Sequence, residues 1–179
     1  MTRFGMLINT KECIGCYTCR VSCQRQNNLN AKEDFVRFIE KENGVYPHVR
    51  TEVIPLQCQH CADAPCAKAC PTGATYVTGD GVVRVDQEKC IGCKYCMAVC
   101  PYDARVANEE TGTVDKCRLC AAELERDGVP NCTCVSACLV GCRMVGDLDD
   151  PSSEISKAIL EQNAQPLTGD ANAKIFYVR

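Results

Sequence analysis

Four cysteines fall close together in the run Cys90-Ile-Gly-Cys93-Lys-Tyr-Cys96-Met-Ala-Val-Cys100-Pro101. Their spacing, C-x2-C-x2-C-x3-C followed by proline, is that of thiolates that bind compact iron–sulfur cores. Thiolates two residues apart all reach one core only when the backbone loops tightly around it, and Gly92 relieves crowding in that loop. The run therefore predicts an iron–sulfur cluster site.

Three further cysteine runs occur, and the four runs together contain all 18 cysteines of the 179-residue chain. The first, Cys13 to Cys23, repeats the same spacing but ends in Gln24 instead of proline. The second, Cys58 to Cys70, has four residues between its second and third cysteines. The last, Cys117 to Cys142, offers six cysteines for four ligand places. Grouping of this kind is typical of cluster ligands.

Two other uses of these cysteines must be weighed. A cysteine content of about a tenth is also typical of short secreted disulfide scaffolds. The first residues show no extended apolar segment, small-residue cleavage site or twin-arginine pair, which weighs against secretion as such a scaffold. Structural zinc takes a ligand pair from each of two separated knuckles, so the third and fourth cysteines of a run are surplus to it. A zinc-dependent structural adaptor is therefore the weaker interpretation.

The composition predicts a small core that bound groups must stabilise. Trp is absent, only four Phe and six Tyr are present, and the length suits one domain or two small fused ones. The formal net charge is −3 and the basic residues are dispersed, so nucleic acid is not an expected partner. No run of 18 or more apolar residues occurs, so we expect no membrane span in the chain itself.

Local patterns predict an α+β fold of short hairpins and helices in which irregular loops dominate. Residues 4–9 are strand-like, and a short helix is expected after Cys19 because residues 19–28 contain no proline or glycine. Residues 35–40 and 49–55 are expected to form a hairpin that turns at Asn43-Gly44.

A repeated unit follows the second and third runs, with a cysteine, a proline, a short hairpin and an acidic residue before the next cysteine. It predicts duplicated cluster-binding domains like those of bacterial ferredoxins. A helix capped by Asp150, with Pro151 in its first turn, and a final strand over residues 173–179 are expected at the end. The expected parts are residues 1–23 with 101–150 as one ferredoxin-like unit, 24–57 as a hairpin insertion, 58–100 as a second ferredoxin-like unit, and 151–179 as a helix and strand tail.

In two-cluster ferredoxins the fourth cysteine of each run binds the other cluster. Applying this crossover to the second and third runs, and then to the first and fourth, gives 16 ligands for four 4Fe-4S clusters. The predicted sets are Cys58, Cys61, Cys66 and Cys100; Cys70, Cys90, Cys93 and Cys96; Cys13, Cys16, Cys19 and Cys138; and Cys23, Cys117, Cys120 and Cys134.

Two cysteines of the last run are left over. Cys134 is the predicted ligand because it restores the C-x3-C spacing to Cys138, and Cys132 is the alternative; the role of Cys142 stays open. His60 lies in a run that already has four cysteines, so we expect it to hydrogen-bond or pack rather than bind iron. Some basic residues near ligands could raise cluster potentials or belong to an ordinary solvated surface; they are Arg84, Lys94 and Arg105.

Motifs beyond the ligands resemble the four-cluster electron-transfer beta subunits of complex iron–sulfur molybdoenzymes, those of polysulfide, thiosulfate, dimethyl sulfoxide and respiratory arsenate reductases. These motifs are C-x-H-C-x3-P-C at 58–66, C-P-T-G-A at 70–74, C-P-Y-D-A-R at 100–105 and G-D-L-D-D-P at 146–151. The resemblance covers essentially the whole chain. It departs at Leu139, where proline is usual, and at the Cys132-Thr133 insertion.

The resemblance implies a non-catalytic relay between a molybdenum or tungsten bis-pterin catalytic subunit and a quinone-handling membrane-anchor subunit. By similarity, the cluster on Cys13 lies nearest the catalytic subunit, followed by those on Cys23, on Cys90 and, nearest the membrane subunit, on Cys58. Association with the membrane through partners is implied, on the extracytoplasmic face after co-export with a signal-bearing partner. A polyferredoxin, or a beta subunit of a hydrogenase or formate dehydrogenase, is the alternative.

Overall fold

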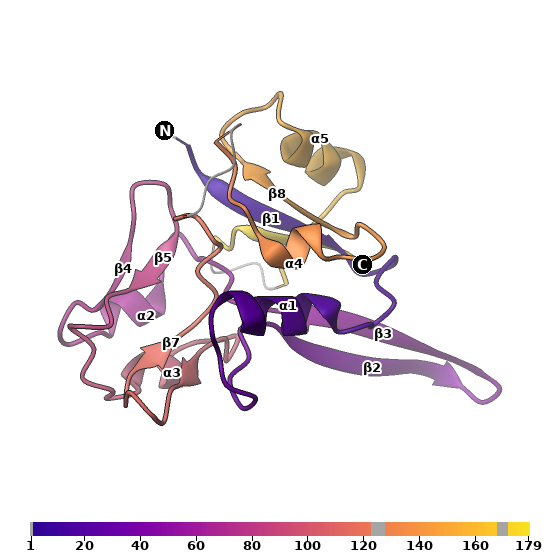
Figure 1. Cartoon of the computed structure of the whole chain (residues 1–179). Helices are drawn as coiled ribbons and strands as arrows, with labels where there is room; N and C mark the ends of the chain where they lie inside the picture. The colour runs from indigo at the N-terminus through magenta and orange to yellow at the C-terminus, as the bar shows by residue number, and fades with distance from the viewer. Residues whose placement is uncertain (1, 123–127, 168–171) are drawn as a thin grey trace.

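The computed structural model describes residues 2–122, 128–167 and 172–179. A three-stranded sheet lies at its centre (Figure 1), and the middle strand is β1 (Phe4–Asn9), which has the predicted bounds. It pairs antiparallel with β8 (Arg143–Asp147) and parallel with β9 (Ile175–Val178). The side chains of Met6 and Ile8 are fully buried. Three segments far apart in the sequence thus share one core.

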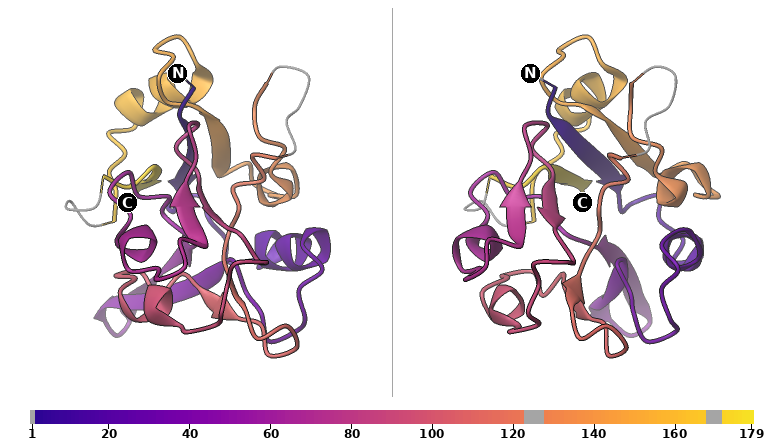
Figure 2. Two further views of the ribbon diagram at one scale, coloured as in Figure 1. Left: turned by 90° about the vertical axis from the view of Figure 1, so that its left-hand side faces the viewer. Right: turned by 60° about the vertical axis from the view of Figure 1, so that its left-hand side comes forward.

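Four short helices begin within the cysteine runs. They are α1 (Thr18–Gln26), α2 (Pro65–Lys68), α3 (Tyr95–Ala98) and α4 (Thr133–Ser136). Helix α1 packs against α4, and α2 packs against α3. Figures 1 and 2 show α2 and α3 on one side of the molecule and α1 and α4 on the other. The packing brings the first run beside the fourth and the second beside the third.

The long hairpin between the first two runs consists of β2 (Arg37–Val45) and β3 (His48–Leu56) and extends away from the body (Figure 1). The predicted turn at Asn43-Gly44 was wrong, because Gly44 pairs with Val49 inside the ladder and the chain reverses at Tyr46-Pro47. Gly44 fits there with a φ of +103°, where a Cβ would lie 2.2 Å from the His48 carbonyl oxygen. Pro47, which has no N–H to give to the ladder, suits the reversal.

The repeated small hairpins are confirmed. One consists of β4 (Thr75–Val77) and β5 (Val83–Val85), and the other of β6 (Val106–Ala107) and β7 (Val114–Asp115). Each joins one cysteine run to the next. The hairpins therefore fix the spacing between the loops that carry the cysteines.

The last helix, α5 (Glu154–Glu161), packs on β1 and β8. Its N-cap is Ser153, whose Oγ accepts a hydrogen bond from the Ser156 N–H at 3.2 Å, so the predicted cap at Asp150 was wrong. Asp150 instead accepts from the Ser152 N–H in the preceding turn at 2.8 Å. None of the helices in the described part of the chain has the length and apolarity that a bilayer crossing requires.

Candidate metal centres

Two cavities are each lined by four cysteines, and every cysteine carries a thiol rather than a disulfide. One small cavity is lined by the Cys90 group: Cys70, Cys90, Cys93 and Cys96. The other is lined by the Cys58 group: Cys58, Cys61, Cys66 and Cys100. Each group takes one cysteine from the other run, as the crossover predicts. Within residues 2–122, 128–167 and 172–179, no three His, Cys, Asp or Glu side chains converge around the position of a single metal ion.

A third set of thiols gathers where α1 meets α4. Burial raises the pKa of Cys23 to about 12, and the thiols of Cys134 and Cys120 add to this shift. Burial also raises the pKa of Cys117, with further contributions from Cys23 and Cys134. These mutual effects indicate four thiols that lie close together. They are Cys23, Cys117, Cys120 and Cys134, which we call the Cys117 group.

The fourth predicted set is the Cys13 group: Cys13, Cys16, Cys19 and Cys138. Burial raises the pKa of Cys19, and Cys13 is one of the thiols that raise it further. Cys16 lies on the exposed side of the same loop. Cys142 adjoins this group, since its Sγ is 3.5 Å from that of Cys138 and its pKa is raised by burial and then by Cys138 and Cys13. The structure thus adds a fifth thiol to the four predicted ones.

Each of the four short helices has a cysteine as its second residue, with 7–8% of its surface exposed. These residues are Cys19 in α1, Cys66 in α2, Cys96 in α3 and Cys134 in α4. Cys132 is instead the N-cap of α4, the place that Ala64 holds in α2. Its Sγ donates a hydrogen bond to the Leu119 carbonyl oxygen at 3.0 Å. A hydrogen bond with Cys132 also lowers the pKa of Cys134. Cys134 is therefore the cysteine that matches the other three helices.

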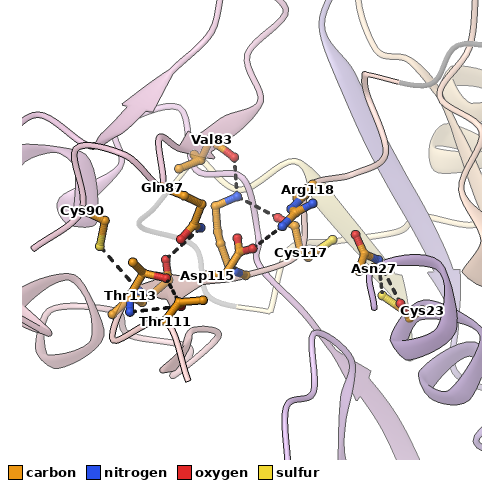
Figure 3. Close-up of polar contacts among 12 residues, drawn as sticks. Cys23, Asn27, Val83, Gln87, Cys90, Thr111, Thr113, Asp115, Cys117 and Arg118 are labelled. Atoms are coloured by element: carbon orange, nitrogen blue, oxygen red, sulfur yellow. Dashed lines mark hydrogen bonds and ion pairs between the residues drawn. The ribbon is translucent and has the colours of Figure 1, made fainter. Parts of the chain in front are cut away.

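N–H groups donate hydrogen bonds to several of the sulfur atoms. The backbone N–H groups of Thr75 and Leu119 donate to Cys70 and Cys117, each at 3.4 Å. The Val114 N–H donates to Cys90 at 3.5 Å and the Asn27 amide to Cys23 at 3.4 Å, and Figure 3 shows the bonds to Cys90 and Cys23 as dashed lines. Burial by itself raises the pKa of Cys70, but hydrogen bonds from Thr75 and Thr72 outweigh it and lower the pKa to about 7. Donors of this kind stabilise thiolates, so the surroundings fit thiolate-bound clusters.

Two expectations about residues beside the cysteines agree with the structure. Gly92 has a φ of +65°, and a Cβ there would lie 2.0 Å from the Gly112 carbonyl oxygen, so the predicted crowding is confirmed. His60 is fully buried, and its Nδ1 accepts a hydrogen bond from the Val83 N–H at 3.2 Å. Burial lowers the pKa of His60, so the imidazole is neutral near pH 7. His60 thus orients strand β5, as its expected hydrogen-bonding role requires.

The basic residues near the cysteines differ sharply in burial. Lys94 is exposed, whereas Arg105 is only 4% exposed. Sequence reasoning missed three further buried cations of the described part of the chain, Lys116, Arg143 and Lys174, which are 1%, 4% and 4% exposed. Lys116 Nζ donates to the carbonyl oxygens of Val83 and Cys117, both labelled in Figure 3. Lys116 and Arg143 are each next to a cysteine in the sequence, which is the one signal that pointed to them, and Lys174 has no such signal.

The spatial order of the four cysteine groups follows from the electrostatic effects that thiols of one group have on thiols of the next. Cys66 of the Cys58 group adds to the burial that raises the pKa of Cys96 in the Cys90 group. Cys58 likewise adds to the raised pKa of Cys117.

At the other junction, Cys134 contributes to the raised pKa of Cys19. The groups therefore follow one another as the Cys90, Cys58, Cys117 and Cys13 groups. Cys93 and Cys16, the exposed cysteines, belong to the two end groups. This order of the cysteine groups differs from the order expected for the last two clusters, because Cys58 shares a buried core with Cys117 and the Cys90 group contains the exposed Cys93.

Comparisons with known proteins give a consistent pattern. Residues 49–148 match the family model described as a 4Fe-4S dicluster domain. One subunit of the sulfite dehydrogenase of Allochromatium vinosum is 38% identical, in an alignment that covers 97% of this chain and 81% of that protein. The arsenate respiratory reductase iron–sulfur subunit of Shewanella sp. is 32% identical, with 99% and 96% covered. One subunit of the tetrathionate reductase of Salmonella typhimurium is 41% identical, with 86% and 62% covered.

Proposed function

This chain belongs to the 4Fe-4S dicluster family of iron–sulfur subunits, and we propose that it relays electrons through four 4Fe-4S clusters to or from a molybdenum or tungsten bis-pterin catalytic subunit. The observation that carries the proposal is the order of the four cysteine groups, in which each end group exposes one cysteine, Cys16 or Cys93. Electrons must enter and leave such a relay at its surfaces, while the inner centres stay buried.

We assign one cluster to each cysteine group, with Cys134 rather than Cys132 in the Cys117 group. The two four-cysteine cavities support half of the assignment, and the mutual pKa effects within the other two groups support the rest. Such clusters supply one-electron transfer when bound. Iron fully ligated by cysteine leaves no open position for a substrate, so the chain's own role is to hold the centres close together and to tune their potentials.

We also infer that the fold is a duplication of ferredoxin-like units. The two helix pairs, α1 with α4 and α2 with α3, and the two small hairpins are consistent with it. The proposed units are residues 1–23 with 101–150 and residues 58–100, with 24–57 as an insertion and 151–179 as a tail. Because β9 lies beside β1, the tail completes the sheet of the first unit.

Apolar side chains surround both ends of the relay. Ile14 and Leu139, next to ligands of the Cys13 group, are 63% and 71% exposed. Ile91 and Tyr95, in the loop of the Cys90 group, are 67% and 61% exposed. Exposed apolar patches of this kind favour contact with other proteins. We propose that the Cys13 end contacts the catalytic subunit and the Cys90 end a quinone-handling membrane subunit or other redox partner.

We further propose that the complex associates with the membrane through these partners. The extracytoplasmic face, reached by co-export with a signal-bearing partner, is favoured over the cytoplasmic face by the resemblance to reductase beta subunits. Protection of a tagged chain from protease in intact cells would contradict that location, provided that a known extracytoplasmic protein is degraded in the same sample.

Native isolation tests the proposed function. The chain is tagged in its own host, purified without oxygen, and analysed for accompanying subunits, molybdenum, tungsten, nickel and pterin. We expect a large pterin-containing subunit with molybdenum or tungsten. Recovery of the solitary chain would indicate a polyferredoxin, and a nickel-containing partner would indicate a hydrogenase; either result contradicts the proposal.

Matched variants test which end binds which partner. Ile14 and Ile91 occupy the same position in two identical C-I-G-C loops, and both are exposed. Ile14→Glu should release the catalytic subunit and keep the membrane subunit, whereas Ile91→Glu should do the reverse. Equal loss of both partners in both variants would contradict the assigned polarity.

A further inference from the structure

Four cations in the described part of the chain are buried without an ion pair to Asp or Glu. One is Lys174, whose ammonium donates to the Gly81 carbonyl oxygen, and the other three lie among the cysteine groups. Arg105, Lys116 and Arg143 are 4%, 1% and 4% exposed, and none of them takes part in an ion pair with Asp or Glu in the described part of the chain. Their hydrogen bonds go to neutral groups: Arg105 to the Thr75 hydroxyl at 3.3 Å, Arg143 to the Gln57 amide oxygen at 2.9 Å, and Lys116 to the Cys117 carbonyl at 2.7 Å. Burying a cation in this way is costly unless negative charge lies nearby.

Arg105, Lys116 and Arg143 each lie between two different cysteine groups. Arg105 lines the cavity of the Cys58 group and donates to the hydroxyl of Thr75, which lines the cavity of the Cys90 group. The Lys116 ammonium donates to the carbonyl oxygen of Val83, which lines the cavity of the Cys58 group, and to that of Cys117 in the Cys117 group.

Arg143 occupies the remaining junction. It begins strand β8, which packs against the helix α4 that carries Cys134 of the Cys117 group. It also directly follows Cys142, whose Sγ is 3.5 Å from that of Cys138 in the Cys13 group. The four groups thus have three junctions, and each junction contains one buried cation.

Arg105 and Arg143 also carry N–H groups that donate no hydrogen bond within the described part of the chain. Nη2 of Arg105 and Nη2 of Arg143 are buried and have no hydrogen-bond partner among the described residues. Buried N–H groups are seldom left without an acceptor, and thiolate sulfur is an acceptor for a guanidinium. These orphaned donors lie beside the cysteines that would become thiolates on binding iron.

We propose that Arg105, Lys116 and Arg143 are tuning cations, each shared by the two clusters that flank it and each raising the reduction potentials of both. The inference rests on the proposed function, since it requires four clusters in the assigned groups. A cluster held by four thiolates is anionic and becomes more so on reduction, so a fixed positive charge nearby in a poorly solvated interior stabilises the reduced form.

Redox titration of the cluster-loaded full chain, followed by electron paramagnetic resonance, tests this. Arg143→Gln should lower the potentials of the clusters on the Cys13 and Cys117 groups and leave the other two in place. Arg105→Gln should lower those on the Cys58 and Cys90 groups instead. Cluster signals are assigned beforehand by the Cys-to-Ser variant of each group.

Exposed basic residues equally near to ligands serve as controls. Arg118 directly follows Cys117 in the sequence but is 51% exposed in its side chain and paired with Asp115. Lys94 directly follows Cys93 and is also exposed. Because solvent screens such charges, Arg118→Gln and Lys94→Gln should leave all four potentials unchanged.

Two results would overturn the proposal: fully loaded Gln variants with unshifted potentials, or an equal shift of all four clusters. If a Gln variant fails to bind its clusters, the charge-retaining Arg105→Lys and Arg143→Lys variants test whether the positive charge sets the potentials. They should load and keep both flanking potentials near those of the parent chain. A Lys variant that fails to load, or loads with lowered potentials, shows that shape rather than charge matters. Fewer than four clusters in the parent would instead refute the proposed function.

Discussion

Cys132 and Cys134 are two buried cysteines separated by one residue. They differ in their position relative to helix α4 and in their hydrogen bonds. Cys134 holds the helix position shared by Cys19, Cys66 and Cys96, whereas the Cys132 thiol donates to the Leu119 carbonyl. We therefore predict that Cys134→Ser loses about one cluster of the four and that Cys132→Ser keeps all of them. Iron and acid-labile sulfide counts per chain measure this. Full iron in Cys134→Ser with loss in Cys132→Ser would reverse the assignment.

Cys100 provides a second test at the residue scale, because it belongs to the third run in sequence and lines the cavity of the Cys58 group in space. Cys100→Ser should therefore damage the cluster on Cys58, Cys61 and Cys66 and spare that on the Cys90 group. Electron paramagnetic resonance of the reduced variant distinguishes the two. Selective loss of the Cys90-group signal would show the crossover to be absent. Cys142→Ser, which alters a thiol outside the four assigned sets, is the control for a general effect of the substitution.

At the scale of elements, the cysteine loops depend on glycines in left-handed conformations. A Cβ at Gly92 would meet the Gly112 carbonyl oxygen at 2.0 Å, whereas Gly73, with a φ of +66°, has no neighbour within 4 Å of such a Cβ. Gly73→Ala should cost only the left-handed conformation, ~1–2 kcal/mol. Gly92→Ala should cost more than that and loosen the Cys90 group. Denaturant midpoints, followed by loss of visible absorption, compare the two, and equal midpoints would contradict the steric account.

Elements were predictable where local pattern determines them and less so where distant contacts do. The bounds of β1 followed from a short, largely apolar run, and the positions of the small hairpins from turn residues. The turn of the long hairpin did not, because Gly44 is held within the ladder by its partner strand. The cap of α5 also depended on which of Asp150 and Ser153 faced the first free N–H, which spacing alone does not decide.

At the scale of the whole molecule, the grouping of cysteines into four sets followed from spacing and the crossover rule, and the cavities agree with two of those sets. Their order did not follow, since it depends on which loops meet in space. The buried positions of Lys116 and Arg143 were also hidden, because a basic residue beside a cysteine is as often exposed, as Arg118 is. Charge burial is a property of the complete fold.

The binding of clusters to all four cysteine groups should depend on pH. Burial raises the pKa of Cys61 to about 11 and that of Cys23 to about 12, above the ordinary thiol value of 9.0. These thiols hold their protons near pH 7 in the metal-free chain, and iron binds the thiolate, so loading releases protons and becomes more favourable as the pH rises from 7 toward 9. Reconstitution yield and proton release in weak buffer measure this. Loading that is independent of pH, or weaker at higher pH, would contradict the buried-thiol account.

The number of 4Fe-4S clusters per chain tests the central claim most directly. The full chain, prepared without oxygen, is analysed for iron, acid-labile sulfide and zinc, and its reduced form is quantified by electron paramagnetic resonance. We predict four clusters per chain, with iron and sulfide in equal amounts and no stoichiometric zinc. Two clusters per chain, or zinc in place of iron, would contradict a four-centre electron relay.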